Sequence, residues 1–179
     1  TPSLDRHRPV ALLAAAPPTL PTAVRALVFQ HATDLRAAVI DLLASAERRL
    51  VLASPFWDEE TVDDLEVLLQ RRAQAGAHID LLGRTIGGES ASGKALHDLA
   101  ERLGPVSCRT VAWLRSSPSD PFGWETFHFK VAIADNERAY LGSANFTTAG
   151  LRSRMELGVL ATGELAQALT SIVDAVMLV

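Results

Sequence analysis

Short apolar segments alternate with amphipathic helical patterns along most of the chain. Residues 48–54 (RRLVLAS), 77–83 (AHIDLLG) and 108–114 (CRTVAWL) are apolar over strand-like lengths, and segments with helical spacing lie between them. A chain built in this way buries its strands under helices. The pattern therefore predicts an α/β fold, a sandwich with a central mixed sheet flanked by helices.

The helical segments place apolar residues three or four positions apart, which gathers them on one face. We expect a first helix over 33–47, with Thr33 as its cap, and a second helix that begins after Asp58. Two more helices follow, the last at the C-terminus. The inward residues are Leu35, Val39, Leu42, Leu43 and Ala46; Val62, Leu65, Leu69 and Ala73; Leu96, Leu99 and Leu103; and Leu165, Leu169, Ile172, Val173 and Val176.

Length and composition favour one domain. A chain of 179 residues, 48% of them apolar, can build one sizeable core and is short for two. We assign residues 23–179 to that domain. Residues 1–22 join basic residues to a short apolar run, but Asp5 and several prolines break the pattern of a secretory leader, so we expect a flexible N-terminal arm. No segment approaches the ~18 apolar residues that span a bilayer, and we expect a soluble, cytoplasmic protein.

The formal net charge of −4 hides an uneven distribution of charge. Six of the 21 acidic residues lie within residues 58–66, which leaves the rest of the chain slightly basic. A phosphate-binding face elsewhere is therefore compatible with the composition. Cys108 is the only cysteine, so no internal disulfide can form, and its apolar neighbours predict a buried strand position.

Two irregular segments invite a functional interpretation. Residues 88–95 (GESASGKA) match most of a nucleotide-binding loop, but such a loop needs Ser or Thr after its lysine to ligate magnesium, and Ala95 stands there. We interpret this segment as a flexible connection. Residues 115–126 (RSSPSDPFGWET) hold several breakers and no periodicity, which predicts a loop that is either a substrate-binding flap or a plain surface connection.

Residues 127–146 (FHFKVAIADNERAYLGSANF) predict a β-hairpin with its turn at residues 135–137. Alternate side chains of a strand share a face. We expect one face of the first strand to belong to the core, and the two alanines of the other face to leave space beside an imidazole and an ammonium group. The core-facing set is Phe127, Phe129, Val131 and Ile133, and the opposite set is His128, Lys130, Ala132 and Ala134.

The return strand adds polar groups to the same region. Ser143 and Asn145 share a face, and the missing side chain of Gly142 lets a ligand approach the backbone. Together with His128 and Lys130, they offer a base or nucleophile, a cation, a hydroxyl and a carboxamide. These groups suit an anion with several oxygens, and phosphate fits best.

The hairpin resembles the HxK(x)4D(x)6GSxN signature of the phospholipase D superfamily, with no departure in residue type or spacing. The resemblance covers residues 127–160 strongly, including an acid at Glu156 in a following strand, and the strand–helix order of residues 48–113 generally. It implies a phospholipase D-like catalytic domain with one motif copy per chain. The signature positions are His128, Lys130, Asp135, Gly142, Ser143 and Asn145.

The resemblance also implies a mechanism. His128 would attack phosphorus through Nε2 to form a phosphohistidine, while Glu156 would accept a hydrogen bond from Nδ1. Lys130 and Asn145 would bind the non-bridging oxygens, and Ser143 would donate a hydrogen bond nearby. No metal or other cofactor is implied, because the lysine supplies the positive charge.

Three further charged residues have less specific roles. Asp135 belongs to the signature, and we expect it to organise the hairpin turn rather than contact substrate. Arg152 and Arg154 are candidates for lining the substrate path, although either could instead pair with Glu156.

Displacement at phosphorus also needs an acid for the leaving oxygen, which a second histidine supplies in this superfamily. None of the other histidines is followed by a lysine two residues later, so the resemblance implies a symmetric homodimer in which two copies of His128 share one active site. The other histidines are His7, His31, His78 and His97.

The resemblance implies a phosphodiester substrate, and the class of phosphodiester has to be inferred. Short single-motif members of the superfamily resemble nucleases, and residues 127–155 carry a modest positive balance, so we expect a DNA nuclease with RNA as the alternative substrate. A subunit of a bacterial anti-phage system fits this description. Two other hypotheses stay open: a phospholipase or phosphatidyl transferase acting on lipids, and a non-catalytic subunit that binds nucleic acid or docks a partner through the acidic helix at 58–66.

Overall fold

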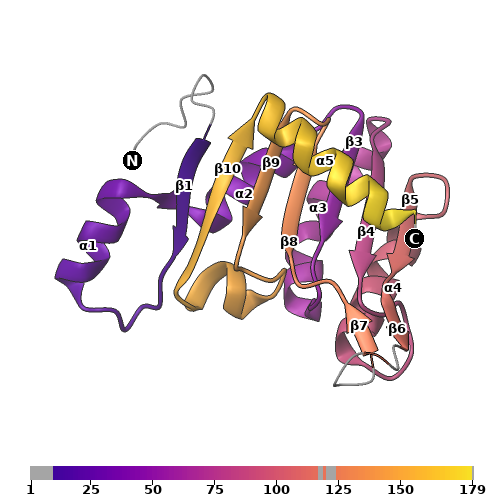
Figure 1. Ribbon diagram of the computed structural model, residues 1–179, viewed down its shortest axis with the longest axis horizontal. Helices are drawn as coiled ribbons and strands as arrows, with labels where there is room; N and C mark the ends of the chain where they lie inside the picture. The colour runs from indigo at the N-terminus through magenta and orange to yellow at the C-terminus, as the bar shows by residue number, and fades with distance from the viewer. Residues whose placement is uncertain (1–9, 117–118, 120–123, 179) are drawn as a thin grey trace.

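Eight strands form one mixed sheet at the centre of the molecule, as Figure 1 shows. The computed structural model describes residues 10–116, 119 and 124–178. The order across the sheet is β2-β1-β10-β9-β8-β3-β4-β5. The strands of this sheet are β1 (Val10–Ala15), β2 (Thr33–Asp34), β3 (Arg49–Ala53), β4 (His78–Gly83), β5 (Cys108–Ala112), β8 (Lys130–Ala134), β9 (Arg138–Gly142) and β10 (Glu156–Thr162).

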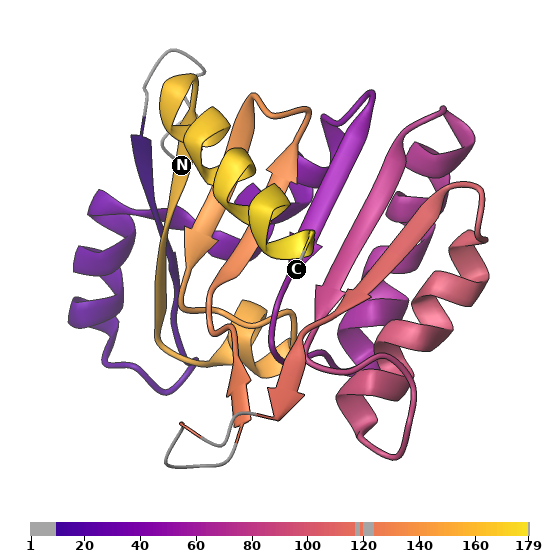
Figure 2. The same cartoon turned by 45° about the vertical axis from the view of Figure 1, so that its right-hand side comes forward.

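Helices cover both faces of the sheet (Figures 1 and 2). Helices α2, α3 and α4 lie on one face, and α5 crosses the other. The predicted α/β sandwich with a mixed sheet is therefore confirmed. The helices are α1 (Thr22–His31), α2 (Leu35–Ala44), α3 (Glu59–Gln74), α4 (Ala91–Leu103) and α5 (Glu164–Met177), with a short π-helical turn η1 (Ala149–Ser153) before β10.

Helices α2, α3 and α4 begin at side-chain caps. Asp58 accepts from the backbone N–H of Thr61 at 2.9 Å, as the sequence predicts. The cap of α2 is Asp34 rather than Thr33, because the Asp34 carboxylate accepts from the N–H of Ala37 at 2.8 Å. Ser90 caps α4, so the second half of the segment 88–95 is helical and is not the flexible connection that we predicted.

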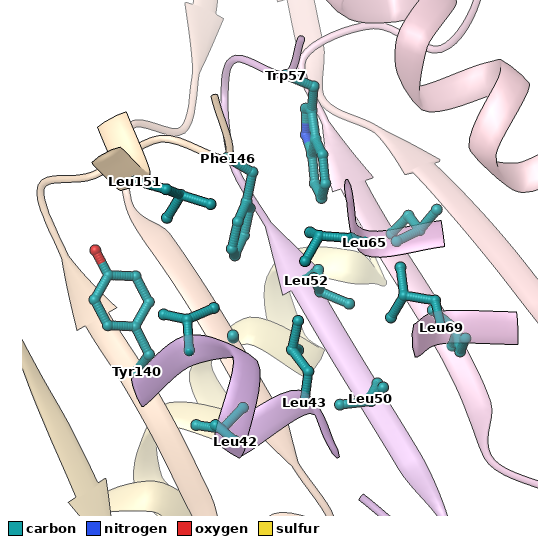
Figure 3. Close-up of a cluster of buried hydrophobic side chains, with 14 of the residues drawn as sticks. Leu42, Leu43, Leu50, Leu52, Trp57, Leu65, Leu69, Tyr140, Phe146 and Leu151 are labelled. Atoms are coloured by element: carbon teal, nitrogen blue, oxygen red, sulfur yellow. The ribbon is translucent and has the colours of Figure 1, made fainter. Parts of the chain in front are cut away.

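The main core lies between the sheet and α2, α3 and α4 (Figure 3). Leu42 and Leu43 of α2 pack there with Tyr140 of β9, and all three are fully buried. Ala132 and Ala134 of β8 belong to this core as well, since α2 packs over β8. The space that we expected beneath His128 is therefore filled by the helix.

The second core lies under α5. Val131 and Ile133 of β8 pack there against Val173 and Met177 of α5, together with Phe127. The predicted core-facing set of the first hairpin strand is thus confirmed, and both faces of β8 are buried because the strand lies in the middle of a sheet covered on both sides.

The N-terminal prediction is wrong for part of its length. We expected residues 1–22 to be a flexible arm, but Val10–Ala15 forms strand β1, which pairs antiparallel with β10 and parallel with β2. The apolar run VALLAA is a sheet strand that pairs with β10, far along the chain, a contact that local periodicity does not encode. The rest of the arm up to residue 9 lies outside the described residues.

The predicted loop at residues 115–126 is also partly wrong. Strands β6 (Leu114–Ser116) and β7 (Trp124–Thr126) pair antiparallel and project from one edge of the main sheet (Figure 2). The middle of the segment, residues 117–118 and 120–123, lies outside the described residues.

Cys108 is a buried strand residue as predicted, and burial raises the pKa of its thiol to about 11.

The hairpin β8–β9 turns at Asp135 and Asn136, which both have positive φ, as a type I′ turn requires. The Asp135 carboxylate accepts three backbone N–H bonds of 2.8 Å from Glu47, Arg48 and Arg49. Burial works to raise the pKa of Asp135, but these donors and the charge of Arg48 outweigh it and lower the pKa. The side chain thus fastens the turn to the start of β3, consistent with the predicted organising role.

We predict that Asp135→Asn destabilises the protein by about 1–3 kcal/mol, because an amide group would face one of the three donors and leave it unsatisfied. Chemical denaturation at neutral pH measures the change. Since folding lowers the pKa of Asp135, its contribution is present above the unfolded value of 3.8 and is lost as pH falls through the lower folded value. The difference between the two proteins should therefore shrink in acid.

The matched control is Asn136→Asp at the exposed neighbouring position of the same turn, which should change the free energy of unfolding by no more than about 0.5 kcal/mol. Equal losses in the two variants, or a difference that grows in acid, would contradict the role given to Asp135.

Candidate active site

The signature residues other than Asp135 gather at one edge of the sheet, at the bottom of Figure 1. Strand β8 begins there at Lys130, β9 ends there at Gly142, and β10 begins there at Glu156. Lys130 pairs with Gly142 in the β8–β9 ladder, and Gly142 pairs with Gly158 in the β9–β10 ladder. Residues separated by up to 28 positions in the sequence are therefore neighbours in space.

Lys130 and His128 are in direct contact. The Nζ atom of Lys130 lies 2.9 Å from Nδ1 of His128 and donates to the His128 carbonyl oxygen at 2.7 Å. Lys130 is only 4% exposed, whereas His128 is exposed. The ammonium is thus held beneath an accessible imidazole, and a ring nitrogen that accepts from it carries no proton of its own.

The charges around this pair alter both of its pKa values. The pKa of His128 is lowered, first by the positive charge of Lys130, then by partial burial and by Arg84. The pKa of Lys130 is lowered by burial; the negative charge of Glu156 opposes this shift and Arg84 adds to it. The imidazole therefore tends to be neutral, which is the form that can act as a nucleophile or base.

Ser143 and Glu156 form a second pair beside the first. The Ser143 hydroxyl donates to the Glu156 carboxylate, and it lies 3.2 Å from both the carbonyl and the N–H of Leu157. The expected hydrogen bond between Glu156 and Nδ1 of His128 is not the one formed, because Lys130 occupies that nitrogen. Glu156 nevertheless lies close enough to raise the pKa of Lys130.

Asn145 is held by a serine that sequence reasoning missed. Ser54, fully buried just after β3, has its hydroxyl 3.3 Å from Oδ1 of Asn145, and that hydroxyl also accepts from the N–H of Phe146 at 3.2 Å. The rings of Phe146 and Trp57 pack together, with their centroids 4.9 Å apart. No local pattern marks Ser54, because its partners lie about 90 residues away.

The interpretation of Gly142 needs correction. We expected its missing side chain to admit a ligand, but the ring of Tyr140 fills the space: a Cβ on Gly142 would lie 2.7 Å from Cζ of Tyr140, and one on Gly158 would lie 2.5 Å from Cε2. Both contacts are too short for real atoms. The Tyr140 hydroxyl accepts from the N–H of Ala144 at 3.2 Å, so the ring also positions the segment between Ser143 and Asn145.

The two arginine candidates are placed differently from each other. Arg152 forms an ion pair with Asp64 of α3, which also pairs with Arg36 at 3.3 Å. Arg154 is exposed and forms no ion pair within the described residues. Neither pairs with Glu156, so that alternative is not the arrangement formed.

Arg84 is a cation of the site that sequence reasoning missed. It follows β4, and its guanidinium lies 4.6 Å from the centre of the Phe56 ring. Its positive charge lowers the pKa values of both His128 and Lys130.

Within residues 10–116, 119 and 124–178, no group of three His, Cys, Asp or Glu side chains is arranged to hold a metal ion. In the same part of the chain, no helix combines the length and apolarity that a membrane span requires.

The fold occurs in solved structures of known proteins. NucT from Helicobacter pylori superposes with a TM-score of 0.68 and 16% sequence identity, and the match covers 94% of each chain. Nuc from Salmonella typhimurium, a phospholipase D family member, superposes with a TM-score of 0.59 and 21% identity over 90% of each chain. At these identities the likeness concerns the fold.

Sequence comparison leads to the same group of proteins. The DISARM protein DrmC from Bacillus paralicheniformis is 24% identical over 127 residues, which is 71% of this chain and 50% of that protein. The chain thus spans half the length of this curated relative. Residues 39–177 match the family described as cardiolipin synthase, PLD-like domain. Because this match covers most of the chain, including every signature position, the protein belongs to the phospholipase D superfamily.

Proposed function

We propose that the protein is a metal-independent nuclease that cleaves DNA, with RNA as the alternative substrate, through a covalent intermediate on His128. The observation that carries the proposal is the exposed imidazole of His128 in contact with the buried ammonium of Lys130. A nucleophile beside a fixed cation suits attack on a phosphodiester, whose negative charge has to be offset as the nucleophile approaches. The superposition on nuclease structures and the basic balance of residues 127–155 support nucleic acid as the substrate.

The phosphate would bind where the cation and the polar groups meet. Lys130 would turn from Nδ1 of His128 to a non-bridging oxygen, and Asn145 would donate its carboxamide N–H to another, since Ser54 fixes its Oδ1. Release of Nδ1 lets the imidazole hold its proton there and donate to Glu156, which leaves Nε2 with a lone pair. Substrate binding would thus convert the ring to its nucleophilic tautomer.

Two displacements at phosphorus follow. Nε2 of His128 forms a bond to phosphorus as the bond to the leaving oxygen breaks, and a protonated imidazole gives that oxygen its proton. The neutral imidazole left behind then takes a proton from water, whose oxygen attacks phosphorus and breaks the N–P bond. The charge on Nδ1 is balanced by Glu156 throughout.

The acid in this scheme is His128 of a second copy. An apolar patch that extends from the site along β1 suits such a contact: Leu12, Met155 and Leu157 are each at least 47% exposed, and Val10 at the far end of β1 is 42% exposed. The patch lies on β1 and the start of β10, on the side of the sheet that α5 crosses but beyond the part that the helix covers (Figure 1). Met155 and Leu157 flank Glu156, so a twin subunit that covers them would lie against the catalytic edge.

An anti-phage role is proposed on a separate basis, the match to the DISARM protein DrmC. Because the chain spans half of that protein, the proposal concerns only the part of such a protein that this chain matches.

We predict that the purified protein cleaves DNA in excess EDTA and that His128→Ala lowers the rate by about 10³-fold or more. The measurement is cleavage of end-labelled oligonucleotides. With ³²P-labelled substrate, quenching should also trap label on the wild-type protein that survives alkali and is released by acid, as expected for a phosphohistidine. His97→Ala, which removes an exposed histidine of α4, is the matched control and should keep full activity. Activity that disappears in EDTA, or persists in His128→Ala, would refute the mechanism.

A second prediction concerns the pKa of His128. Lys130→Met should raise it, because the positive charge that disfavours the imidazolium form is removed. An NMR pH titration of the imidazole Cε1–H signals measures the shift, with the exposed His31 as the internal reference. A pKa that falls or stays constant in Lys130→Met would show that the ammonium does not contact the ring in solution.

A third prediction tests the shared site. Leu157→Arg should give a folded monomer with at least about a hundredfold lower cleavage rate, because the catalytic acid would be lost with the partner. Light scattering after size exclusion gives the mass, and oligonucleotide cleavage gives the rate. Val67→Arg, on the exposed face of α3, adds the same charge at a similarly exposed apolar residue and should remain dimeric and active. A Leu157→Arg monomer with full activity would overturn the dimer proposal.

A further inference from the structure

A cavity of about 770 Å³ lies next to the catalytic edge and plays no part in the mechanism above. Its walls come from the segment after β3, the segment after β4, the first turn of α4, and β6. A volume of this size is typical of sites that enclose a small ligand or a single building block of a larger one.

The cavity shares two walls with the catalytic site. The segment after β3 contacts Asn145 through Ser54, and Phe56 and Trp57 of the same segment line the cavity. Arg84 lines it as well, and the charge of Arg84 acts on His128 and Lys130. A substrate whose phosphate lies on Lys130 could therefore extend into the cavity without leaving the protein surface.

The walls combine an aromatic ring, two cations and hydroxyl groups. Phe56 is 42% exposed and carries the Arg84 guanidinium over its ring. Arg115 of β6 lines the cavity too, and the hydroxyls of Thr85 and Ser90 lie 2.9 Å apart at its rim. Aromatic and guanidinium planes are the surfaces on which unpaired bases stack, and arginine is also a ligand for phosphate.

We propose that this cavity binds one unpaired nucleotide next to the cleaved bond, with its base stacked against Phe56 and Arg84. The inference rests on the proposed function and gives it a strand preference. A base held in its duplex cannot stack on the ring of Phe56 in this cavity without unpairing and unstacking, at an energetic cost. The enzyme therefore acts best on single strands or on unpaired ends.

The test compares two strands that share the same phosphates. Oligothymidylate and a strand of tetrahydrofuran abasic residues are titrated into the His128→Ala protein, which cannot cleave them, and binding is followed by fluorescence anisotropy. The base-bearing strand should bind about tenfold more tightly, as expected for stacking of one base. A duplex of the same length should bind more weakly than the single strand.

Two variants in the same background assign that difference to the cavity. Phe56→Ala removes the ring, and Ala91→Trp fills the cavity from an exposed position of α4 without deleting a contact. In both variants the affinity for oligothymidylate should fall close to that for the abasic strand, whose own affinity should not change. Phe29→Ala is the matched control, because Phe29 also lies under an arginine, Arg25 at 5.1 Å, but on α1 away from the cavity. Thermal unfolding confirms that each variant is folded.

Equal affinities for the two strands in the parent protein, or a tenfold ratio that survives in both cavity variants, would overturn the proposal. Cleavage by the protein with His128 intact separates this failure from that of the nuclease itself. If both strands are cut with equal efficiency, the base site is wrong and the nuclease stands. If neither strand nor any other DNA or RNA is cut, the nuclease proposal is wrong as well.

Discussion

The arrangement of the candidate active site depends on the buried ammonium of Lys130. Removing an unpaired ammonium from water costs several kcal/mol, and a side chain that is only 4% exposed has lost most of its hydration. His128 supplies two acceptors, a ring nitrogen and a carbonyl oxygen, and Glu156 supplies negative charge. These groups offset the desolvation only in part, because the pKa of Lys130 remains lowered. An incoming phosphate would bring the oxygens that this cation lacks, so affinity for the anion follows from the burial itself.

The position of that cation depends on the register of the β8–β9 hairpin. A slip of one residue would turn Lys130 to the opposite face of the sheet and bury the wrong side chain. Asp135 prevents such a slip at one end, where it fastens the turn to three N–H groups of the chain entering β3. Tyr140 does so at the other end, since its ring fits only over two residues without side chains, Gly142 and Gly158. The aspartate and the glycine of the signature therefore act through geometry, while the imidazole and ammonium groups are the ones that we propose to contact substrate.

Local sequence patterns predicted most of the sheet but few of its long-range contacts. The helices of residues 59–103, the strands between them and the hairpin follow from periodicity, which depends on neighbours within a few residues. Strand β1 was missed because its identity as a strand comes from pairing with β10, more than 140 residues later. Ser54 and Arg84 were missed for the same reason, since one is a lone polar residue at a strand end and the other a lone cation in a loop. The signature supplied the remaining site residues because its spacing records a three-dimensional arrangement.

The contact between Lys130 and His128 favours the imidazole tautomer that is inactive in the proposed mechanism. While Lys130 donates to Nδ1, the neutral ring keeps its proton on Nε2, the nitrogen proposed as the nucleophile. Glu156 meanwhile accepts from Ser143 instead of from the imidazole. Both contacts have to change before chemistry can begin, and a phosphodiester on Lys130 would trigger the first of them. A phosphate oxygen can do so because it carries negative charge and accepts more strongly from the ammonium than the neutral ring nitrogen does. In the proposed mechanism the nucleophile is therefore formed by the substrate, which limits phosphoryl transfer to the moment when a phosphate is bound.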